Sequence, residues 1–497
     1  MDSSDKDKIV QSVPQTGFFG HPRGLFTLFF TEFWERFSYY GMRAILLYYM
    51  YYEVTRGGLG LDQETAASIM AIYGSLVYMS GIIGGWVADR LIGTSKTVFY
   101  GGVLIMLGHI VLALPAGVMA LFISMGFIVI GTGLLKPNVS SIVGDVYSDE
   151  DPRRDSGFSI FYMGINAGAL IAPLIVGTVG QQYNFHLGFS LAAVGMFLGL
   201  SLFVVTKRKT LGLAGTYVVN PLTGEEKRKA FSRIGIGALL VVLLGAAGIV
   251  TGLLTIERFV FTVSILGIVI PAAYFVVMYR SPKTSDVERS RLLAYIPLFI
   301  AAMMFWAIQE QGSIILARYA DKRTQLSFAG IELQSSWFQS LNPLFIVVLA
   351  PVFAWLWVKL GSRQPTTPKK FSFGLLFAGL SFLVMIVPAY MNGTESPVNP
   401  MWLVLSFFLV VIGELCLSPV GLSATTKLAP SAFTAQTMSL WFLTNASAQA
   451  INAQIVRFYK PETEILYFGA IGGLSIILGL ILYLISSKIH GMMKGVN

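Results

Sequence analysis

Long apolar segments recur from one end of this 497-residue chain to the other. Crossing the hydrocarbon core of a bilayer takes about 20 apolar residues, and fourteen segments are of that kind. Each must be helical, because lipid cannot hydrogen-bond exposed backbone groups. The predicted spans are 23–52, 65–89, 96–116, 118–145, 156–181, 187–206, 231–253, 260–280, 291–319, 335–359, 370–390, 401–427, 432–458 and 463–489.

Composition supports the same class of protein. Only 12% of the residues are charged, 55% are hydrophobic, and the mean hydropathy is +0.68. A soluble chain of this length needs far more charge to cover its surface. The single cysteine, Cys416, excludes a disulfide framework, and residues 1–15 lack the features of a signal peptide. We therefore predict an all-α polytopic membrane protein.

Basic residues gather in alternate loops between the apolar segments. Short cytoplasmic loops carry an excess of Lys and Arg, so the basic set is predicted to be cytoplasmic, and an even number of spans places both termini there. The net charge of +9 is thus an orientation signal, with no nucleic-acid partner implied. The basic loops contain Arg90, Lys96, Arg153, Arg154, Lys207, Arg208, Lys209, Lys227, Arg228, Lys229, Arg233, Lys283, Arg289, Arg291, Lys359, Arg363, Lys369 and Lys370.

The two halves of the chain resemble each other weakly. Three short stretches, beginning at Gly131, Asn166 and Glu32, align with stretches beginning 282, 279 and 278 residues later. Parallel repeats of six spans are a recurring transporter plan. We therefore predict two six-helix bundles, residues 1–206 and 291–497, joined by residues 207–290, which hold linkers and an inserted hairpin of two spans.

Charged side chains occur inside the first span. Ionisable residues at this depth are costly and usually face a cavity or a partner. At 100° per residue the polar side chains fall within an arc of about 140°, so this face should look into protein or water. A self-neutralising network that only positions the helix is the alternative. The arc comprises Glu32, Glu35, Arg36, Tyr39, Tyr40 and Arg43.

Further polar residues lie inside later spans. Each intramembrane amide could be either a contact between helices or a ligand contact. The positions are Lys136 beside Pro137, Asn166, Glu310 with Trp306 one turn before it, Asn342, and Glu414 with Ser418 one turn after it.

Opposite charges occur at matched depth in the two halves. Arg43 and Glu310 both lie in the outer part of their spans, whereas Lys136 and Glu414 lie near the middle or inward. We expect Arg43 to pair with Glu310 to close the outer mouth of a cavity, and Lys136 to pair with Glu414 to close the inner one. Alternating access needs such a two-state element.

Breaking and remaking these pairs would change the proton affinity of the acids with conformation. That is the physical requirement for proton coupling, and the relevant acids are Glu32, Glu35 and Glu310. Cations at one end of a cavity and a carboxylate with amides at the other suit a zwitterion. A peptide carboxylate would bind Arg43 and Lys136, and a peptide amine would bind Glu310 with help from the two amides.

The motifs around these residues resemble the signatures of the proton-coupled oligopeptide transporter family of the major facilitator superfamily. The resemblance covers the whole chain and includes an inserted hairpin like that of prokaryotic members. The matching motifs are Glu32-x-x-Glu35-Arg36-Phe-x-Tyr39-Tyr40-Gly, Gly131-Thr-Gly-Leu-Leu-Lys136-Pro137-Asn138 and Phe161-Tyr162-Met-Gly-Ile-Asn166-Ala-Gly168, with an Asp89-Arg90 loop like that of the superfamily.

The resemblance implies a major facilitator fold and proton-driven import of di- and tripeptides. It implies proton coupling for Glu32, Glu35 and Arg36, and a place near the peptide carboxylate for Arg43, Lys136, Tyr40 and Tyr78, where Tyr78 rests on the resemblance alone. It implies that Glu310, Asn166 and Asn342 lie near the amine, that Glu414 partners Lys136, and that Trp306, Ser418 and Trp441 line side-chain pockets.

The alternatives are a carrier of another solute and a membrane-embedded enzyme or channel. A channel gives no reason for a six-plus-six repeat. A carrier of nitrate or another small anion could dispense with the first-span acids and Glu310, which this chain keeps. An enzyme would need a nucleophile with a base or a metal cluster, yet the four histidines are scattered without ligand spacing. We expect no metal and no cofactor besides the proton. We expect the protein to be a monomer in a bacterial plasma membrane. We also expect it to transport peptide-like drugs.

Overall fold

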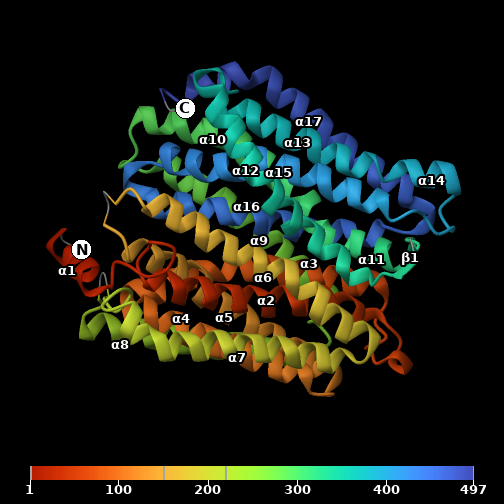
Figure 1. The fold of residues 1–497 in the computed structure, drawn as a ribbon, viewed down its shortest axis with the longest axis horizontal. Coiled ribbons are helices and arrows are strands. Elements are labelled where there is room, and N and C mark those ends of the chain that lie inside the picture. Colours follow the sequence, from red (N-terminus) through yellow and green to blue (C-terminus); the bar gives the residue numbers. More distant parts are fainter. Residues whose placement is uncertain (1–2, 149–150, 219–220, 329, 496–497) are drawn as a thin grey trace.

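The computed structural model describes residues 3–148, 151–218, 221–328 and 330–495. Long helices run side by side, and both termini lie at the same end of the molecule (Figure 1). We call this the terminal end and the opposite one the far end. The small hairpin of β1 (Ser327–Phe328) and β2 (Ile331–Glu332), paired as Ser327 with Glu332, lies at the far end.

Helices account for nearly all of the described structure. After the short α1 (Ser3–Ser12), the first half of the chain contains α2 (Gly24–Tyr51), α3 (Gln63–Val87), α4 (Thr94–Ala113), α5 (Gly117–Asp145), α6 (Arg154–Gln182) and α7 (Phe185–Thr210). A hairpin of α8 (Gly224–Val250) and α9 (Ile256–Arg280) follows. The second half contains α10 (Asp286–Gln309), α11 (Ile315–Lys322), α12 (Leu341–Leu360), α13 (Thr367–Leu383), α14 (Ile386–Asn392), α15 (Met401–Leu428), α16 (Thr434–Ile455) and α17 (Glu464–Met492).

The all-α membrane architecture expected from the sequence is confirmed. Among the described residues, twelve helical stretches are long and apolar enough to cross a membrane. The other two predicted spans, α2 and α16, are 28 and 22 residues long. Four charged residues lower the hydropathy of α2, and amides and hydroxyls lower that of α16. Both pack inside the protein, α2 against α6 and α7, and α16 against α3, α9 and α10.

Some predicted spans are interrupted. The span predicted at 291–319 consists of α10, the tight turn η3 (Glu310–Ser313) and most of α11. The span predicted at 370–390 is divided between α13 and α14. Pro388 explains the second break, because proline lacks an N–H to bond the carbonyl of Val384 and its ring crowds that carbonyl.

Glycines allow the helices that carry the site to approach closely. A Cβ on Gly84 of α3 would lie 1.8 Å from the carbonyl oxygen of Gly133 on α5. Only glycine fits such a contact. It positions the stretch of α5 that contains Lys136 against α3.

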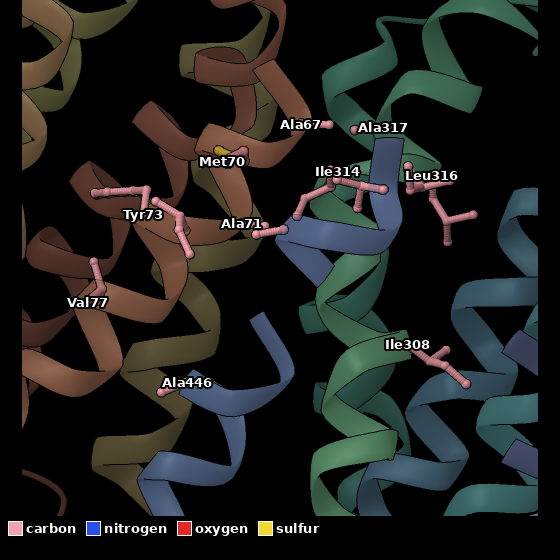
Figure 2. Close-up of a cluster of buried hydrophobic side chains, with 14 of the residues drawn as sticks. Ala67, Met70, Ala71, Tyr73, Val77, Ile308, Ile314, Leu316, Ala317 and Ala446 are labelled. Carbon is pink, nitrogen blue, oxygen red and sulfur yellow. The ribbon is translucent and has the colours of Figure 1, made fainter. Parts of the chain in front are cut away.

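Small and aliphatic side chains connect the two halves of the chain. Ala67 and Ala71 of α3 face the segment around Ile314 and Ala317, as Figure 2 shows. All of these residues are buried. Apolar burial of this kind is non-directional, so the polar contacts described below give the interface its specific register.

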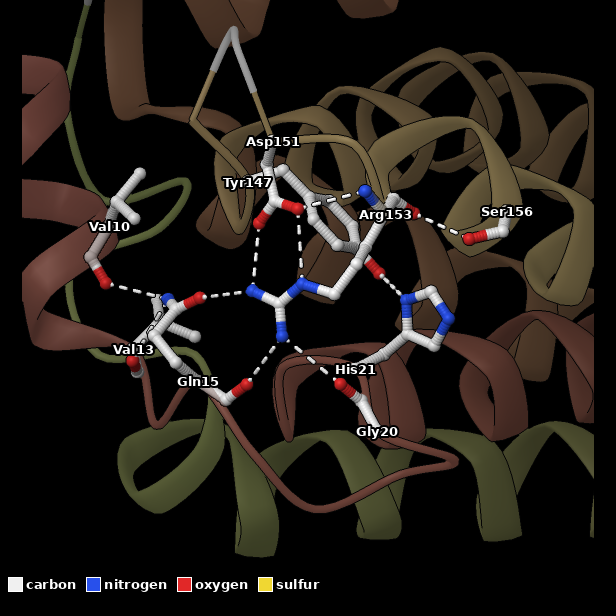
Figure 3. A network of polar contacts seen from close by, with 9 residues as sticks. All are labelled: Val10, Val13, Gln15, Gly20, His21, Tyr147, Asp151, Arg153 and Ser156. Atoms are coloured by element: carbon white, nitrogen blue, oxygen red, sulfur yellow. Dashed lines mark hydrogen bonds and ion pairs between the residues drawn. The ribbon is translucent and has the colours of Figure 1, made fainter.

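A polar network ties the N-terminal segment to the loop between α5 and α6 (Figure 3). Arg153 donates to both carboxylate oxygens of Asp151, at 3.0 and 2.8 Å, and to the carbonyl oxygens of Gln15 and Gly20, both at 3.0 Å. The hydrogen bond from Arg153 holds the pKa of the Asp151 carboxyl below its ordinary value of 3.8. The network therefore stays intact at neutral pH.

The inserted hairpin is attached through one of its two helices. α9 packs against α16 and α3, whereas none of the described residues in the long apolar window of α8 is buried within the protein. An apolar helix that packs on so little of its own chain is suited to lipid contact. The division into units 1–206, 207–290 and 291–497 stays a prediction.

Candidate functional site

A cavity of about 340 Å³ lies between the two halves of the chain. Every site residue predicted from the sequence lines it except Glu35. α2 contributes Glu32, Arg36, Tyr40 and Arg43, α3 contributes Tyr78, α5 contributes Lys136 and α6 contributes Asn166. From the second half come Trp306, Glu310, Asn342, Glu414, Ser418 and Trp441. Nine helical elements thus bring together residues that are up to 409 positions apart, from Glu32 to Trp441.

The first-span charges form one buried cluster. The Nε of Arg36 lies 3.0 Å from Oε1 of Glu32 and also pairs with Glu35. All three side chains are buried, and Glu35 is turned away from the cavity. The guanidinium also lies near the rings of Tyr39 and Tyr40, at 5.4 and 6.0 Å from their centroids. One cation shared by two acids leaves the cluster with a net negative charge when both are ionised.

Arg43 and Glu310 join the two halves across the cavity. Nη2 of Arg43 lies 2.5 Å from Oε2 of Glu310, and both side chains are buried. Glu310 also accepts a hydrogen bond from the Tyr78 hydroxyl at 3.2 Å and one from Nε2 of Gln449 at 2.7 Å. A buried ion pair is tolerated only when such additional hydrogen bonds satisfy its lone pairs. Removing one partner would leave an uncompensated buried charge.

More contacts join the halves beyond this pair, toward the far end. The hydroxyls of Tyr51 and Tyr52, where α2 ends, donate to the two carboxylate oxygens of Asp321 on α11 at 2.8 and 2.5 Å. Arg318 donates to Gln63 at 2.7 Å, and Lys460 pairs with Glu64 at 3.0 Å. Trp337 donates to Thr178 at 2.8 Å. These contacts hold the two halves together between the cavity and the far end.

The other predicted pair is not formed in this conformation. Among the described residues, Lys136 has no carboxylate oxygen within 4.0 Å, and its Nζ lies 4.8 Å from the ring centroid of Tyr78. Glu414 instead accepts a hydrogen bond from Asn342 at 3.3 Å. Asn166 donates to the carbonyl oxygen of Tyr162, four residues earlier, at 3.0 Å. Lys136 is therefore a partly buried cation without a carboxylate partner, and an anionic group entering the cavity could bind it.

Aromatic side chains form the apolar walls of the cavity. Trp441 of α16 fits against Gly421 of α15, where a Cβ would lie 2.1 Å from the indole ring. Trp306 lies one turn before Glu310, and Ser418 lies one turn after Glu414. The cavity thus has charged ends and an aromatic lining, which suits a charged ligand with variable side chains.

Some residues at this site were missed by reasoning from the sequence. Tyr162 and Asn445 line the cavity, and Gln449 contacts Glu310 without lining it. Two signals were available: Tyr162 precedes Asn166 by one helical turn, and Asn445 begins the stretch that aligns with Asn166 in the internal repeat. Nothing in the spacing of Gln449 indicates its partner, because that contact spans 139 residues.

Comparison with known proteins agrees with this geometry. A family model described as the POT family matches residues 95–474. The chain is 66% identical to an uncharacterized transporter, YclF, of Bacillus subtilis (strain 168) over 496 residues, which cover all of both chains. It is 50% identical over 488 residues to a di-/tripeptide transporter of Lactococcus lactis subsp. cremoris, covering 97% of this chain and 98% of the relative.

A solved structure is similar as well. The crystal structure of a variant of a POT peptide transporter in complex with alafosfalin has 70% sequence identity and a TM-score of 0.96, covering 99% of this chain and all of that one. Fold, motifs and whole-length relatives lead to the same assignment, and they confirm the resemblance read from the motifs. The chain belongs to the POT family of proton-coupled oligopeptide transporters.

Proposed function

We propose that this protein imports di- and tripeptides together with protons, by alternating access of the central cavity. The Arg43–Glu310 pair carries the proposal, because one buried acid–base pair joins the two halves of the chain at 2.5 Å. Opening the far end separates these halves and leaves Glu310 without its cation. An isolated buried carboxylate is costly, so opening and proton uptake are linked. Glu32 and Glu35, which share Arg36, provide a second site for protons.

The peptide binds through its two charged ends. Its carboxylate binds Lys136 and Arg43. Tyr40 and Tyr78 lie beside this end of the peptide. Its amine competes with Arg43 for Glu310, so that bound peptide loosens the contact that closes the far end. Asn166 and Asn342 hydrogen-bond the peptide near the amine, and its side chains lie against Trp306, Ser418 and Trp441. The relative solved with alafosfalin supports the extension to peptide-like drugs.

The conformation described above is the one open toward the terminal end. Pairing of Lys136 with Glu414 closes that end in the other half of the cycle, when the Arg43–Glu310 pair is broken. The loops at the terminal end carry most of the basic residues, so we assign that end to the cytoplasm of a bacterial plasma membrane. Uptake by a single chain needs no second copy, and we propose a monomer.

Uptake of labelled dialanine into proteoliposomes tests this function. An inward proton gradient should drive accumulation, and collapsing the gradient with a protonophore should abolish it. Excess unlabelled tripeptide should compete, whereas free alanine and nitrate should not. Accumulation that ignores the gradient, or competition by nitrate instead of peptide, would contradict the proposal.

A further inference from the structure

Gln449 of α16 contacts Glu310 but does not itself line the cavity. Its side chain is fully buried and is not part of the cavity lining, so we expect it to act on Glu310 and not on a bound solute. Nε2 donates to Oε2 of Glu310 at 2.7 Å, whereas Oε1 is buried and has no hydrogen-bond partner among the described residues. A buried amide with one unused acceptor is unusual and needs an explanation.

Gln449 and Glu310 belong to the same half of the molecule. One turn further along α16, Asn452 donates to the carbonyl oxygen of Ala307 at 3.0 Å and accepts from Gln311 at 3.1 Å. These bonds hold α16 to the end of α10 and to the tight turn that carries Glu310. A short tight turn within a helix often marks a functional hinge. Any rearrangement that moves the two halves apart therefore leaves Gln449 beside Glu310.

The other donors to Glu310 come from the opposite half. Arg43 lies on α2 and Tyr78 lies on α3, so both leave when the far end opens. The ionisable groups that face Glu310 from all the surrounding elements are Tyr39, Tyr40 and Arg43 of α2, Tyr78 of α3, Lys136 of α5 and Glu414 of α15. Of these, only Glu414 belongs to the half that contains Glu310, and it offers no compensating positive charge.

A primary amide can serve both protonation states of a carboxyl group. Its N–H donates to a carboxylate, and its carbonyl oxygen accepts from the O–H of a carboxylic acid. We propose that Gln449 is the positioning residue of proton coupling: it donates to ionised Glu310 while the far end is closed and accepts from protonated Glu310 once Arg43 has withdrawn. The proton comes from water on the far side and adds to the carboxylate oxygen that Arg43 released. This inference rests on the proposed proton coupling.

The packing around Gln449 offers a second way to perturb its contact with Glu310. A Cβ on Gly74 of α3 would lie 2.6 Å from Nε2 of Gln449. Gly74 thus leaves room for the amide where the two halves meet. Gly74→Ala changes no ionisable group, and it should push the amide off Glu310 only in the state closed at the far end.

The test uses Gln449→Met in the full-length protein, because methionine has similar length and no comparable hydrogen-bonding group. The matched control is Gln454→Met, on the same helix, where the amide donates to Ser264 at 2.9 Å instead. We expect Gln449→Met to lower the external pH for half-maximal gradient-driven dialanine uptake by about one unit. That is a tenfold effect, or about 1.4 kcal/mol, as expected for one hydrogen bond to an ionisable group. Counterflow exchange, which moves no net protons, should stay near the wild-type rate. Gly74→Ala perturbs only the closed state with ionised Glu310, so it should move the external pH for half-maximal uptake upward, opposite to Gln449→Met.

A measurement without peptide separates this inference from the proposed function. Infrared spectra recorded as the pH is lowered should contain a carboxylic-acid C=O band that is lost in Glu310→Gln. In Gln449→Met this band should move in frequency, because the acid has lost its hydrogen-bond partner, and in Gln454→Met it should not. An unmoved band, or uptake and counterflow that fall together in Gln449→Met with an unchanged pH profile, would overturn the assignment. If wild-type protein carries no peptide but the band still moves, the proposed substrate is wrong and the role of Gln449 stands.

Discussion

Closure of the far end should depend on two tyrosine hydroxyls. Tyr51 and Tyr52 donate to the same buried carboxylate, that of Asp321. Opening this end must break both bonds, since the tyrosines and the acid belong to different halves. A hydrogen bond to a charged group contributes about 1.5–3 kcal/mol. Because the two share an acceptor, their contributions are not additive.

The perturbation is Tyr52→Phe, which deletes one oxygen and leaves the ring in place. At about 1.5 kcal/mol, its loss should lower the ratio of closed to open far ends roughly tenfold. Adding Tyr51→Phe should lower the ratio further, by less than another tenfold, because Lys322 still pairs with Asp321 at 3.1 Å. The sign is unambiguous, since neither hydroxyl has another partner across the interface in the described residues.

Spin labels can measure this ratio. Val54 and Ile331 are exposed at the far end, one in each half, and the only native thiol is removed by Cys416→Ala. Distances between labels at the two positions, recorded in lipid nanodiscs, should gain a longer population in Tyr52→Phe. Tyr49→Phe is the matched control, because Tyr49 lies on the same helix and its buried ring contacts Phe185 and Phe189 of α7 without reaching Asp321. A distance distribution identical in Tyr52→Phe and Tyr49→Phe would refute the reasoning.

Other changes probe the cavity and its supports. Glu310→Gln should abolish gradient-driven uptake but keep counterflow exchange, because the amide still fills the site and cannot take up a proton; loss of both activities would indicate damage to peptide binding. Lys136→Ala should also abolish gradient-driven uptake by removing a cation from the carboxylate end, whereas unchanged uptake would remove this residue from the mechanism. Arg153→Gln should cost about 1 kcal/mol or less of stability, since the pair is partly exposed. Because the pKa of Asp151 is lowered in the folded protein, this contribution to stability is present above about pH 4 and is lost as the pH falls through the folded-state pKa. The difference in melting temperature between Arg153→Gln and wild type should therefore be equal at pH 6 and pH 8.

Much of the architecture follows from the chain alone because a bilayer permits few solutions. Backbone groups in lipid must be satisfied within each span, which makes the apolar segments helical. Glu32, Arg36 and Arg43 could not face lipid, and their spacing puts them on one side of α2. The breaks at Glu310 and at Val384–Met385 were missed, because hydropathy continues across both of them.

What the sequence by itself determined is therefore the class of protein, the helices and the inward face of α2, since each depends on local periodicity and the cost of exposing charge to lipid. Only the tertiary structure decided which charges meet. Arg43 reaches Glu310 while Lys136 stays away from Glu414, although the sequence predicts both pairs equally well. The reason is that these partners are more than 250 residues apart, so the relative orientation of the two bundles decides whether they meet. A transporter of this kind must adopt more than one such orientation. The contact of Gln449 with Glu310 was likewise decided only by the tertiary structure. It depends on how α16 packs against the end of α10, and no local sequence pattern indicates it.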